Sequence, residues 1–139
     1  QGAYIQNQDE NRRISVERTE KVKARVSYSR FNSELEAMLR AVQPDETQAQ
    51  GGSLKTVEVA KGAATLFLAS PSTTMSMWDL CAPSVILQEA GGRITDLYGH
   101  SFDYSQKDTA NRNGVIASNG IIHQDIVARL RCLLGSRKV

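Results

Sequence analysis

A chain of 139 residues, with 40% hydrophobic and 23% charged side chains, is long enough to bury the core of one domain and has the composition of a globular protein. Its formal net charge of +2 is too small to indicate a nucleic-acid or membrane partner by itself. Its apolar runs are too short to span a bilayer and no signal peptide is evident, so we expect a soluble, cytoplasmic domain.

Two features bear on the origin of the chain. Cys81 and Cys132 show neither CxxC spacing nor the pattern of a disulfide framework, so we expect reduced residues that pack inside a cytosolic protein. The chain begins with QGAYIQN rather than with an initiator methionine. We therefore expect a processed or excised part of a longer protein.

The first half of the chain changes from strand patterns to a helix pattern. The sequences GAYI and RISVER within residues 1–18 flank a polar turn and predict a hairpin. Residues 20–30 alternate apolar with charged side chains and predict a half-buried strand. Residues 32–42 carry one apolar stripe and predict a helix that begins with a capping box at Ser33. Residues 44–50 are polar, and we expect a loop there.

The second half of the chain continues to alternate between the two patterns. It predicts, in order, a helix over 54–61, a strand that ends at Leu68, a helix over 80–89, strands over 93–97 and 114–118, and a last helix that Asn119 caps. Strands that alternate with helices are typical of α/β domains. We therefore predict one domain over residues 1–139, a layered sandwich with a central mixed or parallel sheet and helices on both faces.

The aspartate in the sequence MWDLCAP stands where a helix is expected to begin. In one interpretation Asp79 accepts hydrogen bonds from N–H groups of the first turn and only caps the helix, which is worth about 1 kcal/mol. In the other interpretation a carboxylate held ionised at a strand-to-helix junction binds a hard cation. Spacing alone leaves both interpretations open.

A second candidate site is the sequence GGSLK, at residues 51–55. Gly52 lets the backbone approach a ligand closely, and Ser53 can cap the helix that follows. Lys55 falls in the first helical turn, where a cation opposes the helix dipole. Glycines, a helix N-terminus and a lysine together suit an anion such as phosphate. The alternative is an ordinary surface lysine that extends into solvent.

Four stretches of sequence form a set when they are taken in order: QGAYIQN…RISVER, GGSLKTVEVAKGAATLFL, WDLCAPSVILQEAGGRITDLYG and NGVIASNGIIHQDIVARL. They resemble the C-terminal half of the inositol monophosphatase family. That family has a Gly-Ala hairpin, a helix–strand pair, a Trp-Asp motif that runs into Glu-Ala-Gly-Gly, and a closing strand and helix. The resemblance covers nearly the whole chain.

The resemblance implies a fold and a chemistry. Family members are magnesium-dependent, lithium-sensitive phosphomonoesterases with an αβαβα layered fold, in which Mg²⁺ ions activate a water and clamp the phosphate. Asp79 matches the metal-binding aspartate of the Trp-Asp motif. The family's other ligands, a Glu-Glu pair and an Asp-Pro-Ile/Leu-Asp-Gly-Thr motif, do not occur in this sequence. The resemblance therefore implies the C-terminal half of a longer enzyme, and we expect the isolated chain to be inactive.

Two local features bear on the substrate. Ser29 and Arg30 lie in a segment similar to the Ser-Arg-Ser-His segment of 3'(2'),5'-bisphosphate nucleotidases. Gly52, Ser53 and Lys55 lie in one that resembles their Gly-Ser-Ser-Leu-Lys, whose lysine contacts phosphate. The resemblance implies removal of the 3'-phosphate from 3'-phosphoadenosine 5'-phosphate, with these residues on the substrate. Inositol monophosphatase or histidinol phosphate phosphatase activity is the alternative.

A function of another class also stays open. The chain could be a non-catalytic half-domain that binds a partner half, or a second copy of itself, through an exposed sheet or helix face. A half-domain exposes the apolar surface that its other half would cover, and exposed apolar patches mark interaction sites.

Overall fold

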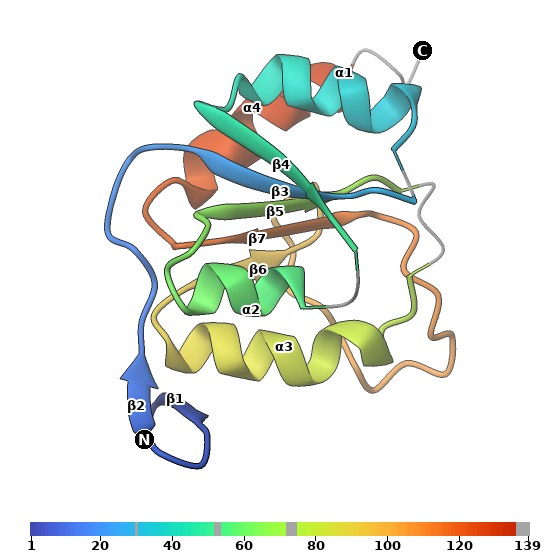
Figure 1. Ribbon diagram of the computed structural model, residues 1–139. Helices are drawn as coiled ribbons and strands as arrows, with labels where there is room; N and C mark the ends of the chain where they lie inside the picture. The colour runs from blue at the N-terminus through green and yellow to red at the C-terminus, as the bar shows by residue number, and fades with distance from the viewer. Residues whose placement is uncertain (30, 52–53, 72–74, 136–139) are drawn as a thin grey trace.

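The computed structural model describes residues 1–29, 31–51, 54–71 and 75–135. Over these ranges the chain forms a two-stranded hairpin and a five-stranded sheet with helices on both of its faces (Figure 1). The elements are β1 (Ala3–Gln6), β2 (Asn11–Ile14), β3 (Lys23–Ser27), α1 (Ser33–Val42), β4 (Glu46–Gln50), α2 (Lys55–Ala60), β5 (Leu66–Ala69), α3 (Trp78–Glu89), β6 (Arg93–Thr95), β7 (Val115–Ser118) and α4 (His123–Gly135). The prediction of an α/β sandwich with a mixed sheet is confirmed.

The five-stranded sheet has the order β4-β3-β5-β7-β6. Strand β3 pairs in parallel with β4 and with β5, whereas β7 is antiparallel to both of its neighbours, β5 and β6. The register pairs Ser27 with Gln50 and Ala69 with Val115. Strands β3, β4, β5 and β6 therefore end at the same edge of the sheet, where β7 begins.

Strand β5 shows why the sheet carries two cores. Its sequence LFLA is buried throughout, and successive side chains of a strand point to opposite faces. Leu66 and Leu68 join the core under α1 and α4, while Phe67 and Ala69 join the core under α2 and α3. A strand covered on both faces reads as a continuous apolar run, as β5 and β7 do.

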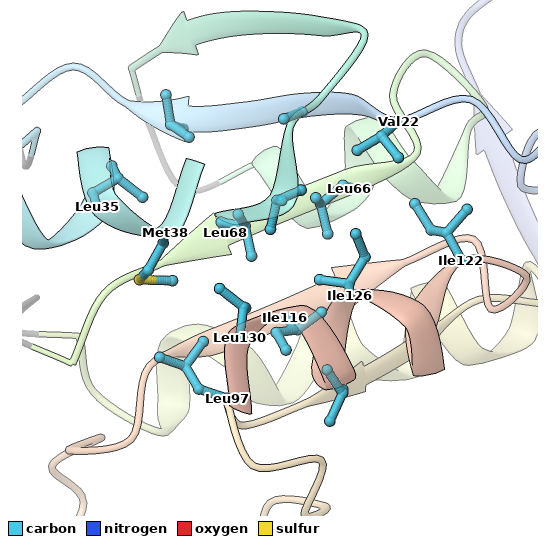
Figure 2. Close-up of a cluster of buried hydrophobic side chains, with 14 of the residues drawn as sticks. Val22, Leu35, Met38, Leu66, Leu68, Leu97, Ile116, Ile122, Ile126 and Leu130 are labelled. Carbon is cyan, nitrogen blue, oxygen red and sulfur yellow. The ribbon is translucent and has the colours of Figure 1, made fainter. Parts of the chain in front are cut away.

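The core under α1 and α4 holds most of the large aliphatic side chains (Figure 2). Among its fully buried members are Leu35, Met38, Leu66, Leu68, Leu97, Ile116, Ile126 and Leu130. The helices α2 and α3 cover the opposite face. Both faces of the sheet are thus covered by helices, and the expectation of an exposed sheet face as a partner surface is wrong.

The N-terminal hairpin packs against the α2–α3 layer rather than joining the five-stranded sheet. Ala3 of β1 and Ile14 of β2 are buried in the core that also contains Leu80 and Leu87 of α3. The N–H of Val16 donates to the carbonyl of Ala90, the residue that follows α3, at 3.0 Å. These contacts attach the hairpin to the C-terminal end of α3.

The first helix is capped one residue earlier than the sequence suggested. The side chain of Asn32, not Ser33, accepts a hydrogen bond from the N–H of Leu35, at 2.8 Å, and Ser33 is already helical. Asn119 does not cap α4 itself, as was predicted, but holds the turn before it, because its side-chain oxygen accepts from the N–H groups of Ile121 and Ile122, which precede the helix. At Asn32, asparagine does what serine or aspartate would do at an N-cap.

The predicted loop over residues 44–50 is wrong, since Glu46–Gln50 forms β4. The strand lies at the edge of the sheet, and its side chains are exposed or half-buried. Because neither side of β4 is fully buried, its sequence does not alternate between apolar and polar residues. Such alternation is the pattern from which a strand is predicted. The guanidinium of Arg25, on the neighbouring strand β3, lies 3.5 Å from the Glu46 carboxylate and donates to the carbonyl of Ala63.

A buried imidazole joins β6, β7 and α4. Nε2 of His123 lies 2.9 Å from the Thr95 hydroxyl, and Nδ1 lies 2.7 Å from the Ser118 hydroxyl. The side chain has no exposed surface. Burial lowers the pKa of His123 to about 4, and the positive charge of Arg93 acts in the same direction. The imidazole is therefore neutral in the folded protein near pH 7.

Two further observations concern the surface. Cys81 and Cys132 are both exposed, so the expectation that they pack inside the protein is wrong. Within the described ranges, no helix combines the length and apolar character that crossing a bilayer requires.

Candidate functional site

The loops that carry the predicted site residues, or lead to the helices that carry them, all leave the same edge of the sheet. Residues 28–29 follow β3, residues 51–54 lead from β4 to α2, and residues 70–77 lead from β5 to α3. The longest of these connections, residues 96–114, joins β6 to β7. In α/β sheets, ligands bind in the crevice beyond the carboxyl ends of the strands. The topology thus brings segments that are distant in sequence to one place.

Asp79 lies in the first turn of α3, and its side chain is exposed. Its Oδ2 accepts a hydrogen bond from the backbone N–H of Ser76, at 3.2 Å, just before the helix. The residue at the N-cap position is Met77, which makes no side-chain cap. Asp79 therefore joins the first turn to the residue before the helix, which differs from the first interpretation, in which it accepts from N–H groups of the first turn itself. Its carboxylate also stays open to solvent, as the second requires.

The chain that precedes α3 is held by the β6–β7 connection. The N–H of Met77 donates to the carbonyl of Thr109 at 2.7 Å, and the N–H of Asn111 donates to the carbonyl of Met75 at 3.0 Å. Ser76 and Ala110 form an isolated antiparallel bridge. The backbone beside Asp79 is therefore fixed by contacts from outside its own helix.

Lys55 is the first residue of α2, and its side chain is only 5% exposed. Its Nζ donates to the carbonyl of Gln50 at 3.4 Å and lies 5.6 Å from the centre of the Phe67 ring. The alternative of an ordinary surface lysine is wrong. The Lys55 side chain thus lies between a carbonyl dipole and an aromatic face, both of which attract an ammonium group.

The remaining predicted residues are only partly within the described ranges. Ser29 is exposed, and its hydroxyl lies 3.3 Å from that of Ser27. Gly52, Ser53 and Arg30 lie outside the described residues. The interpretation that Ser53 caps α2 therefore stays a prediction.

Sequence analysis did not assign the residues of the pocket at this edge, which has a volume of about 360 Å³. Its wall includes Met77, Asp96, Phe102, Asp108 and Asn113. One signal was available, because the sequence RITDLYG ends a strand with an aspartate before a glycine turn. The connection that follows has no periodic pattern from which its course could be inferred.

Asp96 has a structural role within this pocket. Although it is buried, its Oδ1 accepts from the N–H groups of Tyr98 and His100, each at 2.9 Å, and its Oδ2 accepts from the side chain of Asn113 at 3.3 Å. Asp103, at the surface, has a pKa below its ordinary value because the hydroxyl and N–H of Ser105 donate to it. These carboxylates shape the β6–β7 connection.

The described residues do not by themselves complete a magnesium site. Magnesium binds several oxygen ligands in near-octahedral geometry. Within the described ranges, no group of three His, Cys, Asp or Glu side chains converges as a metal site would require. Asp79, whose carboxylate is exposed, can supply one such ligand.

The fold and this edge define a class: an α/β domain in which a buried lysine and an exposed aspartate stand at helix starts beyond the strand ends, where such domains bind small ligands. The model of the inositol monophosphatase family matches residues 1–134, and the chain belongs to this family.

The chain is also similar to individual proteins. The chain is 32% identical over 91 residues to the 3'(2'),5'-bisphosphate nucleotidase 1 of Dictyostelium discoideum, a match covering 63% of this chain and 29% of that protein. It is 34% identical over 83 residues to the histidinol-phosphatase of Mycobacterium tuberculosis, covering 60% and 28%. The solved structure of the Thermotoga maritima IMPase superposes with a TM-score of 0.71 at 21% identity, covering 90% of this chain and 47% of that one. The chain thus spans about half of that solved structure.

Proposed function

We propose that this chain is one half of a magnesium-dependent phosphomonoesterase. The observation that carries the proposal is that the exposed carboxylate of Asp79 and the buried side chain of Lys55 stand at the starts of two helices, each of which follows a strand that ends at the same edge of the sheet. The carboxylate suits a hard cation and the ammonium suits a phosphate. Membership of the inositol monophosphatase family supports the same chemistry.

The substrate we propose is 3'-phosphoadenosine 5'-phosphate, from which the enzyme would remove the 3'-phosphate. A substrate with two phosphates requires a cation besides the metal site, and burial keeps Lys55 in one place for that task. Gly52, Ser53, Ser29 and Arg30 are the other residues we propose for phosphate binding. The nucleotidase relative supports this substrate, whereas the histidinol-phosphatase relative supports the alternative of a phosphate monoester such as histidinol phosphate or inositol phosphate.

In the complete enzyme Asp79 would be one metal ligand, and a second segment would supply the other carboxylates. Bound Mg²⁺ supplies an activated water and stabilises the oxygens of the transferred phosphoryl group. Asp79 is oriented for its part by its hydrogen bond from Ser76. We also propose a cytoplasmic location and expect the isolated chain to lack activity.

The test compares substrates within one variant. In the polypeptide of the complete reading frame, Lys55→Met should lower kcat/KM for 3'-phosphoadenosine 5'-phosphate by about tenfold or more beyond its effect on a monophosphate, because only the bisphosphate loses a charged contact. Lys61→Ala, just past the end of the same helix, should change neither value. Equal losses on the two substrates would remove the argument for a second phosphate.

The alternative of a non-catalytic half-domain makes a different prediction. If the polypeptide of the complete reading frame releases no phosphate from any of these esters with Mg²⁺ present, the catalytic proposal fails. A binding role would then be the better description.

A further inference from the structure

The sequence contains the dipeptide Asn-Gly twice, at residues 113–114 and 119–120. The two lie at opposite ends of β7, since Asn113 precedes the strand and Asn119 follows it. In this dipeptide the backbone nitrogen of the glycine can attack the side-chain carbonyl carbon of the asparagine, because glycine has no Cβ to obstruct the approach. How readily the attack occurs depends on how firmly the fold holds the two groups.

The side chain of Asn119 is held at both of its polar atoms. It is only 2% exposed, and its Nδ2 donates to the carbonyls of Glu17 and Thr19, at 2.9 and 2.8 Å. Its Oδ1 accepts from two backbone N–H groups of the turn before α4. The N–H of Gly120 donates to the Ser118 hydroxyl at 3.1 Å. Both the amide that would leave and the nitrogen that would attack are therefore occupied.

Asn113 is held less firmly. The residue is exposed, and the one hydrogen bond of its side chain among the described residues runs from Nδ2 to Oδ2 of Asp96, at 3.3 Å. Neither the side-chain oxygen of Asn113 nor the N–H of Gly114 has a hydrogen-bond partner in the part of the chain that the structure describes. The fold thus leaves the first Asn-Gly able to react and protects the second.

We propose that Asn113 is a site of spontaneous deamidation. The nitrogen of Gly114 attacks Cγ of Asn113 and closes a succinimide ring, while the side-chain amide leaves as ammonia with the proton that the Gly114 nitrogen gives up. Water then adds to one of the two ring carbonyls and opens the ring to an aspartate or an isoaspartate. The net change is the gain of one water and the loss of one ammonia. The inference does not depend on the proposed catalytic activity.

The reaction would alter the support of the candidate site. The new carboxylate takes the place of the amide that donates to Asp96, so a buried carboxylate loses a donor and gains a like charge beside it. The hydrogen bonds to Asp96 organise the β6–β7 connection. That connection fixes the backbone before Asp79 through the hydrogen bond between Met77 and Thr109. We therefore expect deamidation to loosen the connection and to lower the free energy of unfolding.

The second Asn-Gly provides an internal control for the test. The 139-residue chain is incubated at mildly alkaline pH, both folded and in guanidinium chloride, and peptide mass spectrometry follows the replacement of NH₂ by OH at each asparagine. In the folded chain we expect Asn113 to convert about tenfold or more faster than Asn119. In guanidinium chloride the two should convert at similar rates, because the hydrogen bonds that protect Asn119 are lost.

Two substitutions separate the reaction from its consequence. Asn113→Gln keeps a side-chain amide but would have to close a larger ring, so it should stay unconverted over the same period. Asn113→Asp reproduces one product directly and should lower the urea midpoint of the chain. Asn7→Asp makes the same chemical change in the hairpin turn, where the side chain only accepts hydrogen bonds, and should have little effect.

Three results would contradict these expectations. A folded chain in which Asn119 converts as fast as Asn113 would overturn the proposal. So would a folded chain in which neither asparagine converts although both do in guanidinium chloride, because the fold would then protect Asn113 as well. An Asn113→Asp chain as stable as the wild type would overturn the inferred effect on the β6–β7 connection.

Discussion

The buried imidazole of His123 makes the free energy of unfolding depend on pH, and replacing His123 should remove that dependence. The pKa of His123 falls from an ordinary 6.5 to about 4 on folding. Between these values the unfolded chain binds the proton and the folded chain does not, so stability falls as the pH drops below about 6.5 and levels off below about 4. The full shift corresponds to about 3 kcal/mol, of which about 2 kcal/mol is lost between pH 7 and pH 5.

Urea unfolding of the 139-residue chain at pH 7 and pH 5 measures this loss. In His123→Gln the loss between the two pH values should be smaller by about 2 kcal/mol, because the amide cannot titrate. His100→Gln removes an imidazole whose side chain is 75% exposed and should keep the response of the wild type. If wild type and His123→Gln lose the same free energy between pH 7 and pH 5, the burial argument is wrong.

Three further substitutions test the fold by urea unfolding at pH 7. Asn32→Ala should lower the free energy of unfolding by about 1 kcal/mol through loss of the α1 cap, and Ser33→Ala should have little effect. Gly114→Ala should cost about 2 kcal/mol or more, because φ is +69° and the new Cβ would lie 2.5 Å from the Ala69 carbonyl oxygen. Leu130→Ala should cost about 2–5 kcal/mol by opening a cavity in the core.

Each of these three has a result that would contradict it. A larger effect from Ser33→Ala than from Asn32→Ala would mean that Ser33 caps α1, as the sequence suggested. A Gly114→Ala protein as stable as Gly135→Ala, whose site has no atom within 4 Å, would mean that the turn can relax. An effect of Leu130→Ala no larger than that of the exposed Leu54→Ala would mean that the core is not packed as described.

The parts of the fold that sequence analysis predicted are those where burial leaves a pattern. Leu35 and Met38 recur at helical spacing because one side of α1 is buried, and the apolar run of β5 reports burial on both sides. Strand β4 left no such pattern, since an edge strand with polar side chains is stabilised by its backbone pairing with β3. Its parallel partner lies more than 20 residues away, a distance that local patterns cannot bridge.

The candidate site shows the same limit. Asp79 and Lys55 could be selected as candidates because a carboxylate and a lysine stand at predicted helix starts. The residues that surround them in the fold could not be predicted. The contact of Lys55 with the Phe67 ring forms only because the sheet brings β5 beneath α2. The pocket residues were missed because the β6–β7 connection is organised by side-chain hydrogen bonds to Asp96 rather than by periodicity.

The most direct test of the central claim is phosphate release from 3'-phosphoadenosine 5'-phosphate. It is measured with and without Mg²⁺ in the polypeptide of the complete reading frame, in its Asp79→Asn variant, and in the 139-residue chain alone. We predict magnesium-dependent release by the first, a loss of about a hundredfold or more in kcat in the second through loss of a metal ligand, and no release by the third. Full activity of Asp79→Asn, or release at enzyme-like rates by the 139-residue chain, would contradict the account.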